Sequence, residues 1–165
     1  MRAICHGGGA LTLFLSKFDN KVDRKGRVSI PAPWRTALAG QSFAGVIVHP
    51  SPVNQGAVGS GMDRMERLSE SIDTLNPYGE DFGALAATIL TDSFQLPFDG
   101  DGRVILPQDI LEHTGITEFA TFAGFGRTFQ IWQPDAFKIF RAESKELARE
   151  QARKLKLVDP SKNND

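Results

Sequence analysis

The sequence predicts an α+β fold that is rich in β-structure and is built from two related halves. The first observation is an internal repeat: residues 21–31 read Lys-Val-Asp-Arg-Lys-Gly-Arg-Val-Ser-Ile-Pro, and residues 98–107 read Phe-Asp-Gly-Asp-Gly-Arg-Val-Ile-Leu-Pro. The second is the alternation of apolar and polar residues around each copy, which is typical of strands. The third is that apolar residues have helical spacing in the segment between the two copies and in the segment after the second copy. Two copies in 165 residues predict a pseudo-symmetric pair of halves, not a solenoid.

The first half begins with an expected strand over residues 11–18, where Leu13 and Leu15 lie on one side and Phe14 on the other. Residues 19–26 are polar and rich in turn-forming residues, and their final glycine can adopt the positive φ of a tight turn. These features predict a strand that is followed by a hairpin turn.

A short strand and a short helix are expected next. Over residues 27–30 the alternation places Val28 and Ile30 toward the core. Pro31 closes this strand and opens the helix, since a proline at a helix start removes only an N–H that would lack a partner there. Gly40 ends the helix.

The rest of the first half and the connector follow from composition and spacing. Residues 43–48 are predicted to form a strand, and residues 49–61 a loop because they are rich in Pro, Gly and Ser. The first half is therefore expected to lack a final strand. Residues 62–75 have helical spacing, Asn76-Pro77 ends that helix, and residues 80–90 start a second one.

The second half repeats this order. Its expected elements are strands over 91–96, 103–106, 119–124 and 127–132, a turn over 98–102, a short helix over 107–114, and a long helix from Pro134. Four apolar residues of the long helix are expected to face inward: Phe137, Phe140, Leu147 and Leu155. The expected divisions are 11–61 for the first half, 62–90 for the helical connector, 91–140 for the second half, and 141–165 for the C-terminal helix and tail.

Composition predicts a soluble cytoplasmic protein. The single cysteine, Cys5, excludes a disulfide within the chain and fits a reducing compartment. No apolar run approaches the roughly 20 residues that a membrane span needs. Residues 7–9 are glycines that interrupt any signal-peptide core, so no export signal is expected.

Charge is distributed unevenly, although the net charge is only −1. Residues 16–35 contain six basic and two acidic residues, whereas residues 63–118 contain three basic and twelve acidic ones. The first copy of the repeat is therefore basic and the middle of the chain is acidic.

The turn pattern Asp-x-x-x-Arg has a structural and a functional interpretation. In the structural one, the aspartate caps backbone N–H groups of the turn and pairs with the arginine. In the functional one, clustered cations contact a phosphate backbone and an arginine fork reads guanine in the major groove. The candidate DNA-binding residues are Lys17, Lys21, Arg24, Lys25, Arg27 and Arg103. Only Arg103 belongs to the second copy, so the first half is expected to make most contacts.

Several segments resemble the MraZ family of bacterial transcriptional regulators. Residues 22–31 resemble the first Asp-x-Lys-Gly-Arg block of that family, and residues 99–107 its second block. Leu75-Asn76-Pro77 and two segments of the second half, Ala123-Gly124-Phe125 and Phe129-Gln130-Ile131-Trp132, also resemble family segments. The resemblance covers residues 11–140.

The resemblance implies two tandem swapped-hairpin halves of the AbrB-like type, forming a pseudo-symmetric β-barrel with connecting and C-terminal helices. It also implies a nucleoid-associated repressor that forms ring-like homo-oligomers. Such a repressor binds short G-rich direct repeats in double-stranded DNA, upstream of the division and cell-wall gene cluster that contains its own gene. By motif position, Arg27 and its counterpart Arg103 would contact DNA. The structural residues of the motif would be Asp23, Gly26, Asp99 and Gly102.

Two features depart from the family pattern. The segment over residues 50–61 lacks the apolar strand expected there, and Asp101 occupies the position of Lys25 in the second copy. The second departure weakens any inference that this half contacts DNA.

Two other classes of function compete with this interpretation. An enzyme is not expected, because Cys5, His6, His49 and His113 lack metal-ligand spacing, and Asp99 and Asp101 fit a turn. No cofactor, metal or small-molecule substrate is expected either. The alternative that stays open is an antitoxin-like or scaffold protein, which would use the same hairpins to bind a protein partner.

Overall fold

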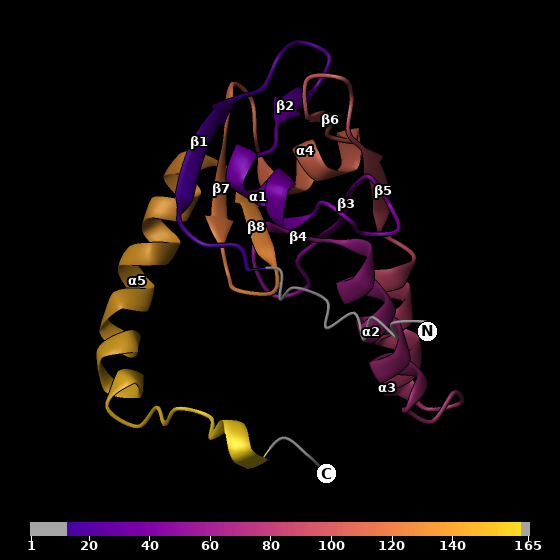
Figure 1. Cartoon of the computed structure of the whole chain (residues 1–165), viewed down its shortest axis with the longest axis vertical. Helices are drawn as coiled ribbons and strands as arrows, with labels where there is room; N and C mark the ends of the chain where they lie inside the picture. The colour runs from indigo at the N-terminus through magenta and orange to yellow at the C-terminus, as the bar shows by residue number, and fades with distance from the viewer. Residues whose placement is uncertain (1–12, 163–165) are drawn as a thin grey trace, which may run out of the picture.

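Two antiparallel sheets, with helices packed around them, form the α+β fold of residues 13–162, the part of the chain that the computed structural model describes (Figure 1). The strands are β1 (Lys17–Lys21), β2 (Arg27–Ser29), β3 (Gly45–Pro50), β4 (Ala57–Ser60), β5 (Phe94–Pro97), β6 (Arg103–Ile105), β7 (Phe119–Gly124) and β8 (Phe129–Trp132). The α-helices are α1 (Ala32–Ala37), α2 (Met62–Asp73), α3 (Glu80–Leu85), α4 (Gln108–Thr114) and α5 (Pro134–Ala152). A π-helical turn, η1 (Ala86–Leu90), continues α3, and a 3₁₀ turn, η2 (Pro160–Lys162), follows α5.

The order of strands shows that the two halves exchange structure. The larger sheet has the order β1-β7-β8-β4-β3-β5, and the smaller sheet pairs β2 with β6. The first strand of each half therefore pairs with the other half, β1 with β7 and β5 with β3. Exchanging the halves reproduces the same order, so the backbone has a pseudo-twofold axis. Neither half could form its sheet alone.

One aromatic cluster lies at the centre of the core. Trp34 is 1% exposed and makes edge contacts with Phe14 and Phe18, which precede it, and with Phe122 from the other half. Its indole Nε1 donates a hydrogen bond to the carbonyl oxygen of Leu15 at 3.0 Å. The core is therefore shared between the halves, as the repeat predicted.

The structure confirms most of the expected elements. Helix α2 begins at Met62 and buries Ile72, and Gly115 ends α4 with a φ of 73°. The strands of both repeat copies bury alternate residues, Val28 and Ile30 in the first. Among residues 13–162, no helix combines the length and the apolar composition needed to cross a membrane.

The prediction of a loop over residues 49–61 is wrong, because that segment contains the end of β3 and all of β4. Strand β4 pairs with both β3 and β8, so the first half does have its final strand. A Cβ atom on Gly59 would overlap the ring of Phe129. Gly59 therefore indicates close packing between strands and not a loop.

The strand expected over residues 11–18 is displaced toward the C-terminus. Residues 11 and 12 lie outside the described residues, and Phe14 makes only an isolated bridge with Gly126. Ser16 has a φ of 76°, which interrupts the extended backbone, and β1 begins at the next residue. Phe14 is buried, whereas Leu13 and Leu15 are exposed.

The inward face expected for the last helix is correct only at its start. Phe137 is buried and Phe140 is partly buried against Trp132. Leu147 is 61% exposed, and Leu155 lies beyond the end of the helix at 79% exposure. The reason is that α5 leaves the sheet after about three turns (Figure 1). The polar tail predicted after it includes residues 163–165, which lie outside the described residues.

Gly59→Ala should destabilise the fold, since its methyl group would displace the Phe129 ring at the junction of the halves. Overpacking of this kind lowers the free energy of unfolding by about 1–3 kcal/mol. Urea titration followed by circular dichroism measures the change. The matched control is Gly83→Ala on α3, where a Cβ atom has nothing within 4 Å. That variant should be unchanged or more stable by up to about 1 kcal/mol; equal losses in both variants would contradict the packing argument.

Candidate nucleic-acid interface

The two copies of the repeat meet in one two-stranded ribbon. Strands β2 and β6 are antiparallel, with Val28 opposite Val104, and both valines are 1% exposed. Side chains alternate across a strand, so the flanking residues point away from the core. This outward face carries Arg27 and Ser29 from β2 and Arg103 and Ile105 from β6. The pseudo-twofold axis passes between the valines and places the two arginines on the same face.

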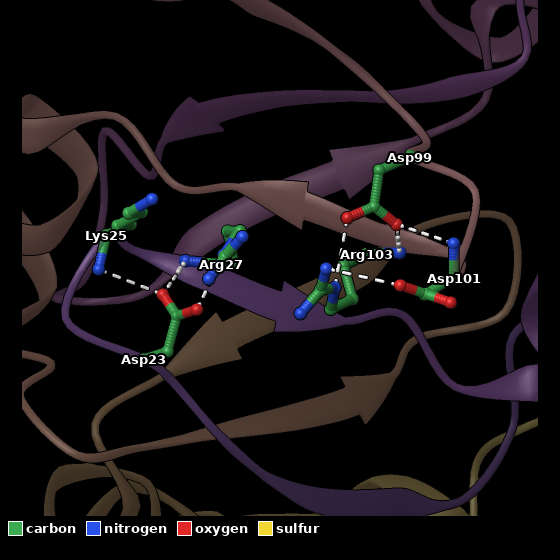
Figure 2. A network of polar contacts seen from close by, with 6 residues as sticks. All are labelled: Asp23, Lys25, Arg27, Asp99, Asp101 and Arg103. Carbon is green, nitrogen blue, oxygen red and sulfur yellow. Dashed lines mark hydrogen bonds and ion pairs between the residues drawn. The ribbon is translucent and has the colours of Figure 1, made fainter.

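In the first turn, Asp23 holds the backbone and the arginine together (Figure 2). Its Oδ1 accepts hydrogen bonds from the backbone N–H groups of Lys25 and Arg27, both at 2.9 Å. Its Oδ2 accepts from the Nε of Arg27 at 2.6 Å. This is the arrangement of the structural interpretation, in which the aspartate caps the turn and pairs with the arginine.

The second turn repeats this geometry and adds one interaction. Asp99 accepts from the backbone N–H groups of Asp101 and Arg103 and from the Nε of Arg103, each at 2.9 Å. The Nη2 of Arg103 also lies 3.3 Å from the carboxylate of Asp101 (Figure 2). Within residues 13–162, Arg103 therefore has two carboxylate partners, whereas Arg27 has one.

Each turn is also hydrogen-bonded to the opposite half. The carbonyl oxygen of Gly26 accepts from the backbone N–H of Leu106 at 2.8 Å, and that of Gly102 accepts from Ile30 at 3.2 Å. Both glycines have a positive φ, 80° and 72°, which other residues rarely adopt. The positive φ predicted for Gly26 is confirmed.

The turns stabilise their carboxylates in the charged form. The backbone N–H of Arg27 is the main cause that lowers the pKa of Asp23, and the guanidinium of Arg27 and the N–H of Lys25 act in the same direction. The backbone N–H of Arg103 likewise lowers the pKa of Asp99. Both aspartates are therefore ionised at neutral pH and hold the arginines beside them.

The structure brings most of the predicted cations together and separates one. Lys21, Arg24 and Lys25 are exposed on or beside the first turn. Lys17 lies at the opposite end of β1 from Lys21, four residues away, which is about 13 Å along the strand. There it lines a cavity of about 460 Å³ with Phe137 and Phe140 of α5. Lys17 is thus not part of the cluster at the turn.

The two ribbon arginines differ in their free hydrogen-bonding capacity. In both, the Nε is used within the turn. Among residues 13–162, the Nη nitrogens of Arg27 have no hydrogen-bond or ion-pair partner, and its side chain is 33% exposed. An Nη nitrogen of Arg103 is already engaged by Asp101. Arg27 therefore presents more donors to a ligand above the ribbon.

Two side chains near the ribbon were missing from the predicted set. Ile105 is 58% exposed on the outward face. Arg35, from α1 of the first half, packs so closely on the second turn that a Cβ atom on Gly102 would overlap its guanidinium. Its cation therefore lies beside the turn that lacks lysines. The basic count over residues 16–35 included Arg35, but only the exchange of halves shows where it lies.

His49 and His113 are both packed or hydrogen-bonded within the fold. His49 is buried, and burial lowers its pKa, while Nε2 of His113 lies 3.1 Å from the carbonyl oxygen of Gly56. Within residues 13–162 there is no group of three or more His, Cys, Asp or Glu side chains that could hold a metal ion. Cys5 and His6 lie outside the described residues.

Comparison with known proteins gives consistent matches. The family model for the MraZ protein, whose description adds a likeness to antitoxins, matches residues 89–158. A transcriptional regulator MraZ from Rickettsia akari is 45% identical over 141 residues, covering 86% of this chain and 95% of that protein. Another, from Pelagibacter ubique, is 41% identical over 153 residues, covering 93% and 99% respectively. A third, from Rickettsia bellii, is 42% identical over 142 residues.

Asp23→Asn should lower stability in a manner that depends on pH. The native pKa lies below the ordinary value of 3.8, so the carboxylate stabilises the fold above pH 3.8. That contribution is lost as the pH falls through the lower native pKa. Urea unfolding at neutral pH should therefore show a less stable variant, and the difference should shrink at pH values below 3.8.

The matched control is Glu118→Gln. The side chain of Glu118 makes no hydrogen bond or ion pair within the described part of the chain. No comparable pH-dependent difference is expected for it. A loss in Asp23→Asn that stays constant to the lowest pH would mean that the change in shape, not in charge, is responsible.

Proposed function

The chain belongs to the MraZ family of transcriptional regulators, which are not enzymes. On this basis we propose that it is a repressor that binds short G-rich direct repeats in its own promoter. The genes controlled would be those of the division and cell-wall cluster that contains its own gene. The regulator would act in the cytoplasm, associated with the nucleoid. The observation that carries the proposal is the β2–β6 ribbon, with two arginines on its outward face.

A two-stranded ribbon has the dimensions to enter the major groove of B-DNA. In that groove, an arginine fork can donate two hydrogen bonds to O6 and N7 of guanine, which is the commonest base-specific contact. Arg27 keeps its Nη donors available while its Nε is fixed by Asp23. A guanidinium held in this way loses little conformational freedom on binding. Asp23 thus positions the arginine that reads the base.

The first turn supplies the contacts to the phosphate backbone in this proposal. Lys21, Arg24 and Lys25 are exposed beside Arg27, and each phosphate that they neutralise releases counterions. The second turn has Gly100 and Asp101 in place of Arg24 and Lys25. Arg103 therefore contributes less, and Arg35 supplies a cation beside it.

Self-association is the second part of the proposal. One copy presents few cations for a chain of net charge −1, so several copies in a ring-like homo-oligomer would bind repeated sites together. Within each copy, we propose that residues 11–61 and 91–140 act as swapped-hairpin halves of a pseudo-symmetric barrel. Residues 62–90 link the halves, and residues 141–165 form the helix and tail.

A protein partner is the alternative ligand of the same hairpins. The likeness to antitoxins in the family description favours it, and so does exposed Ile105 on the ribbon, since an apolar side chain suits a protein surface. The experiments below separate the two ligands.

Fluorescence anisotropy of labelled duplexes tests DNA recognition directly. We expect a duplex with G-rich direct repeats to bind more tightly than a shuffled duplex of the same composition. The affinity for the repeats should fall steeply as salt rises, because binding releases counterions. Equal and weak binding to both duplexes at low salt only would contradict the repressor proposal and favour the protein partner.

Arg27→Ala should weaken binding to the repeats by about 1–3 kcal/mol, the range for a bidentate contact to guanine. Arg103→Ala should weaken it less, because Asp101 already engages that guanidinium. Each variant loses the ion pair between its arginine and the aspartate that caps its turn, and Arg103→Ala also loses the exposed contact with Asp101, so each serves as the structural control for the other. Circular dichroism checks that both remain folded. Equal losses of affinity would show that the two halves contact DNA alike.

A further inference from the structure

The second half of α5 lacks packing partners among residues 13–162. The contacts of this helix with the sheet involve Phe137 and Phe140, and every residue from Lys145 to the end of the helix is exposed. A helix depends on tertiary packing for most of its stability, because short helices are marginal in water. Leu147, at 61% exposure, is an apolar side chain on this unpacked part. These features indicate a surface that another molecule covers.

A stripe of cations runs along the same helix. Five basic residues follow one another at intervals of three or four positions: Lys138, Arg141, Lys145, Arg149 and, at the C-cap, Arg153. This spacing places them on one side of a helix. All five are exposed, and none forms an ion pair within residues 13–162.

Helix α2 carries the complementary stripe. Four carboxylates recur at intervals of three or four positions on its exposed side: Asp63, Glu66, Glu70 and Asp73. They too form no ion pairs in the described part of the chain. Tyr78, in the turn after α2, and Leu85, on α3, are exposed at 97% and 37%. The α2–α3 hairpin therefore matches the distal part of α5 in charge.

The two stripes cannot meet within one molecule. Helix α5 contacts β7, next to the edge strand β1, whereas α2 contacts β3, next to the edge strand β5. These are opposite edges of the six-stranded sheet, and Figure 1 shows the helices on opposite sides of the molecule. Only a second copy can bring a basic stripe against an acidic one.

We propose that the distal part of α5 of one copy packs on the α2–α3 hairpin of the next copy. The inference rests on the self-association proposed above and names its surfaces. Cations of α5 would face the α2 carboxylates across this contact. Because the two surfaces differ, the contact is heterologous, and repeated copies close into a ring when the rotation between them allows it.

The charges that flank both stripes are also complementary. On α5, Glu146 and Glu150 lie next to the basic stripe, and on α2, Arg64 and Arg67 lie next to the acidic one. Each surface thus presents a basic row beside an acidic row. Single exposed ion pairs contribute little, but matched rows fix the partner and its orientation, since like charges brought together are repelled.

Charge reversal on one surface at a time tests the assignment. The α5 variant is Arg149→Glu with Arg153→Glu, and the α2 variant is Glu66→Arg with Glu70→Arg. Sedimentation velocity measures the assembly of each protein, and circular dichroism checks that each is folded. Either variant alone should have an assembly constant weakened by more than about tenfold, because like charges would face each other.

Mixing the two variants tests whether the reversed α5 surface and the reversed α2 surface restore the contact. In an equimolar mixture the acidic α5 of one variant meets the basic α2 of the other, and the remaining surfaces are unchanged and also match. Assembly should therefore return in the mixture. The matched control is Glu112→Arg with Glu118→Arg, which changes the net charge as much as the α2 variant does at exposed residues elsewhere. This control should assemble like the wild type.

The outcomes separate this inference from the proposed function. A wild-type protein that stays monomeric at all concentrations would overturn self-association itself. A wild type that assembles, with both reversal variants assembling equally well, would overturn this interface and leave self-association standing. Binding of each variant to a duplex with a single repeat should be unchanged, because the ribbon lies elsewhere. A mixture that fails to restore assembly would also overturn the assignment.

Discussion

The fold depends on a pair of backbone hydrogen bonds, one from each turn to the opposite half. Gly26 accepts from Leu106, and Gly102 accepts from Ile30. These bonds are possible because each glycine adopts a positive φ and turns its carbonyl group toward the other copy. They align β2 with β6, bury the two central valines, and leave the arginines on the outside. The exchange of edge strands in the larger sheet follows the same pseudo-twofold axis.

The sequence allowed the local elements to be predicted well and the long-range pairing poorly. Alternation located β2, β6, β7 and β8, because period-two patterns depend only on neighbouring residues. The loop prediction for β4 is wrong, because Gly56 and Gly59 are residue types typical of loops. Their small size instead makes room for Trp132 and Phe129 from the other half. A composition rule cannot identify such contacts, because the residues that require the glycines lie about seventy positions away.

The candidate site shows why the structural and functional interpretations of the turn are compatible. The Nε of Arg27 serves the turn through Asp23, while its Nη nitrogens remain for a ligand. The motif could be predicted to do either, since both uses require an aspartate and an arginine four residues apart. What the sequence could not provide was the second partner of Arg103, the position of Arg35 on the other half's turn, or the distance of Lys17 from the cluster.

The symmetric backbone carries an asymmetric charge, and this has a consequence for the proposed function. A ribbon with a true twofold axis would bind a groove equally well in two opposite orientations, which suits palindromic sites. Here Arg24 and Lys25 have Gly100 and Asp101 as counterparts, so the two ends of the ribbon differ. In the proposed complex, such a ribbon would have a preferred direction on DNA. Direct repeats also have one direction, and a head-to-tail contact between α5 and α2 gives every copy the same direction. The charge asymmetry of the ribbon is therefore what the proposed direct repeats and the proposed heterologous contact would both require of a polar assembly.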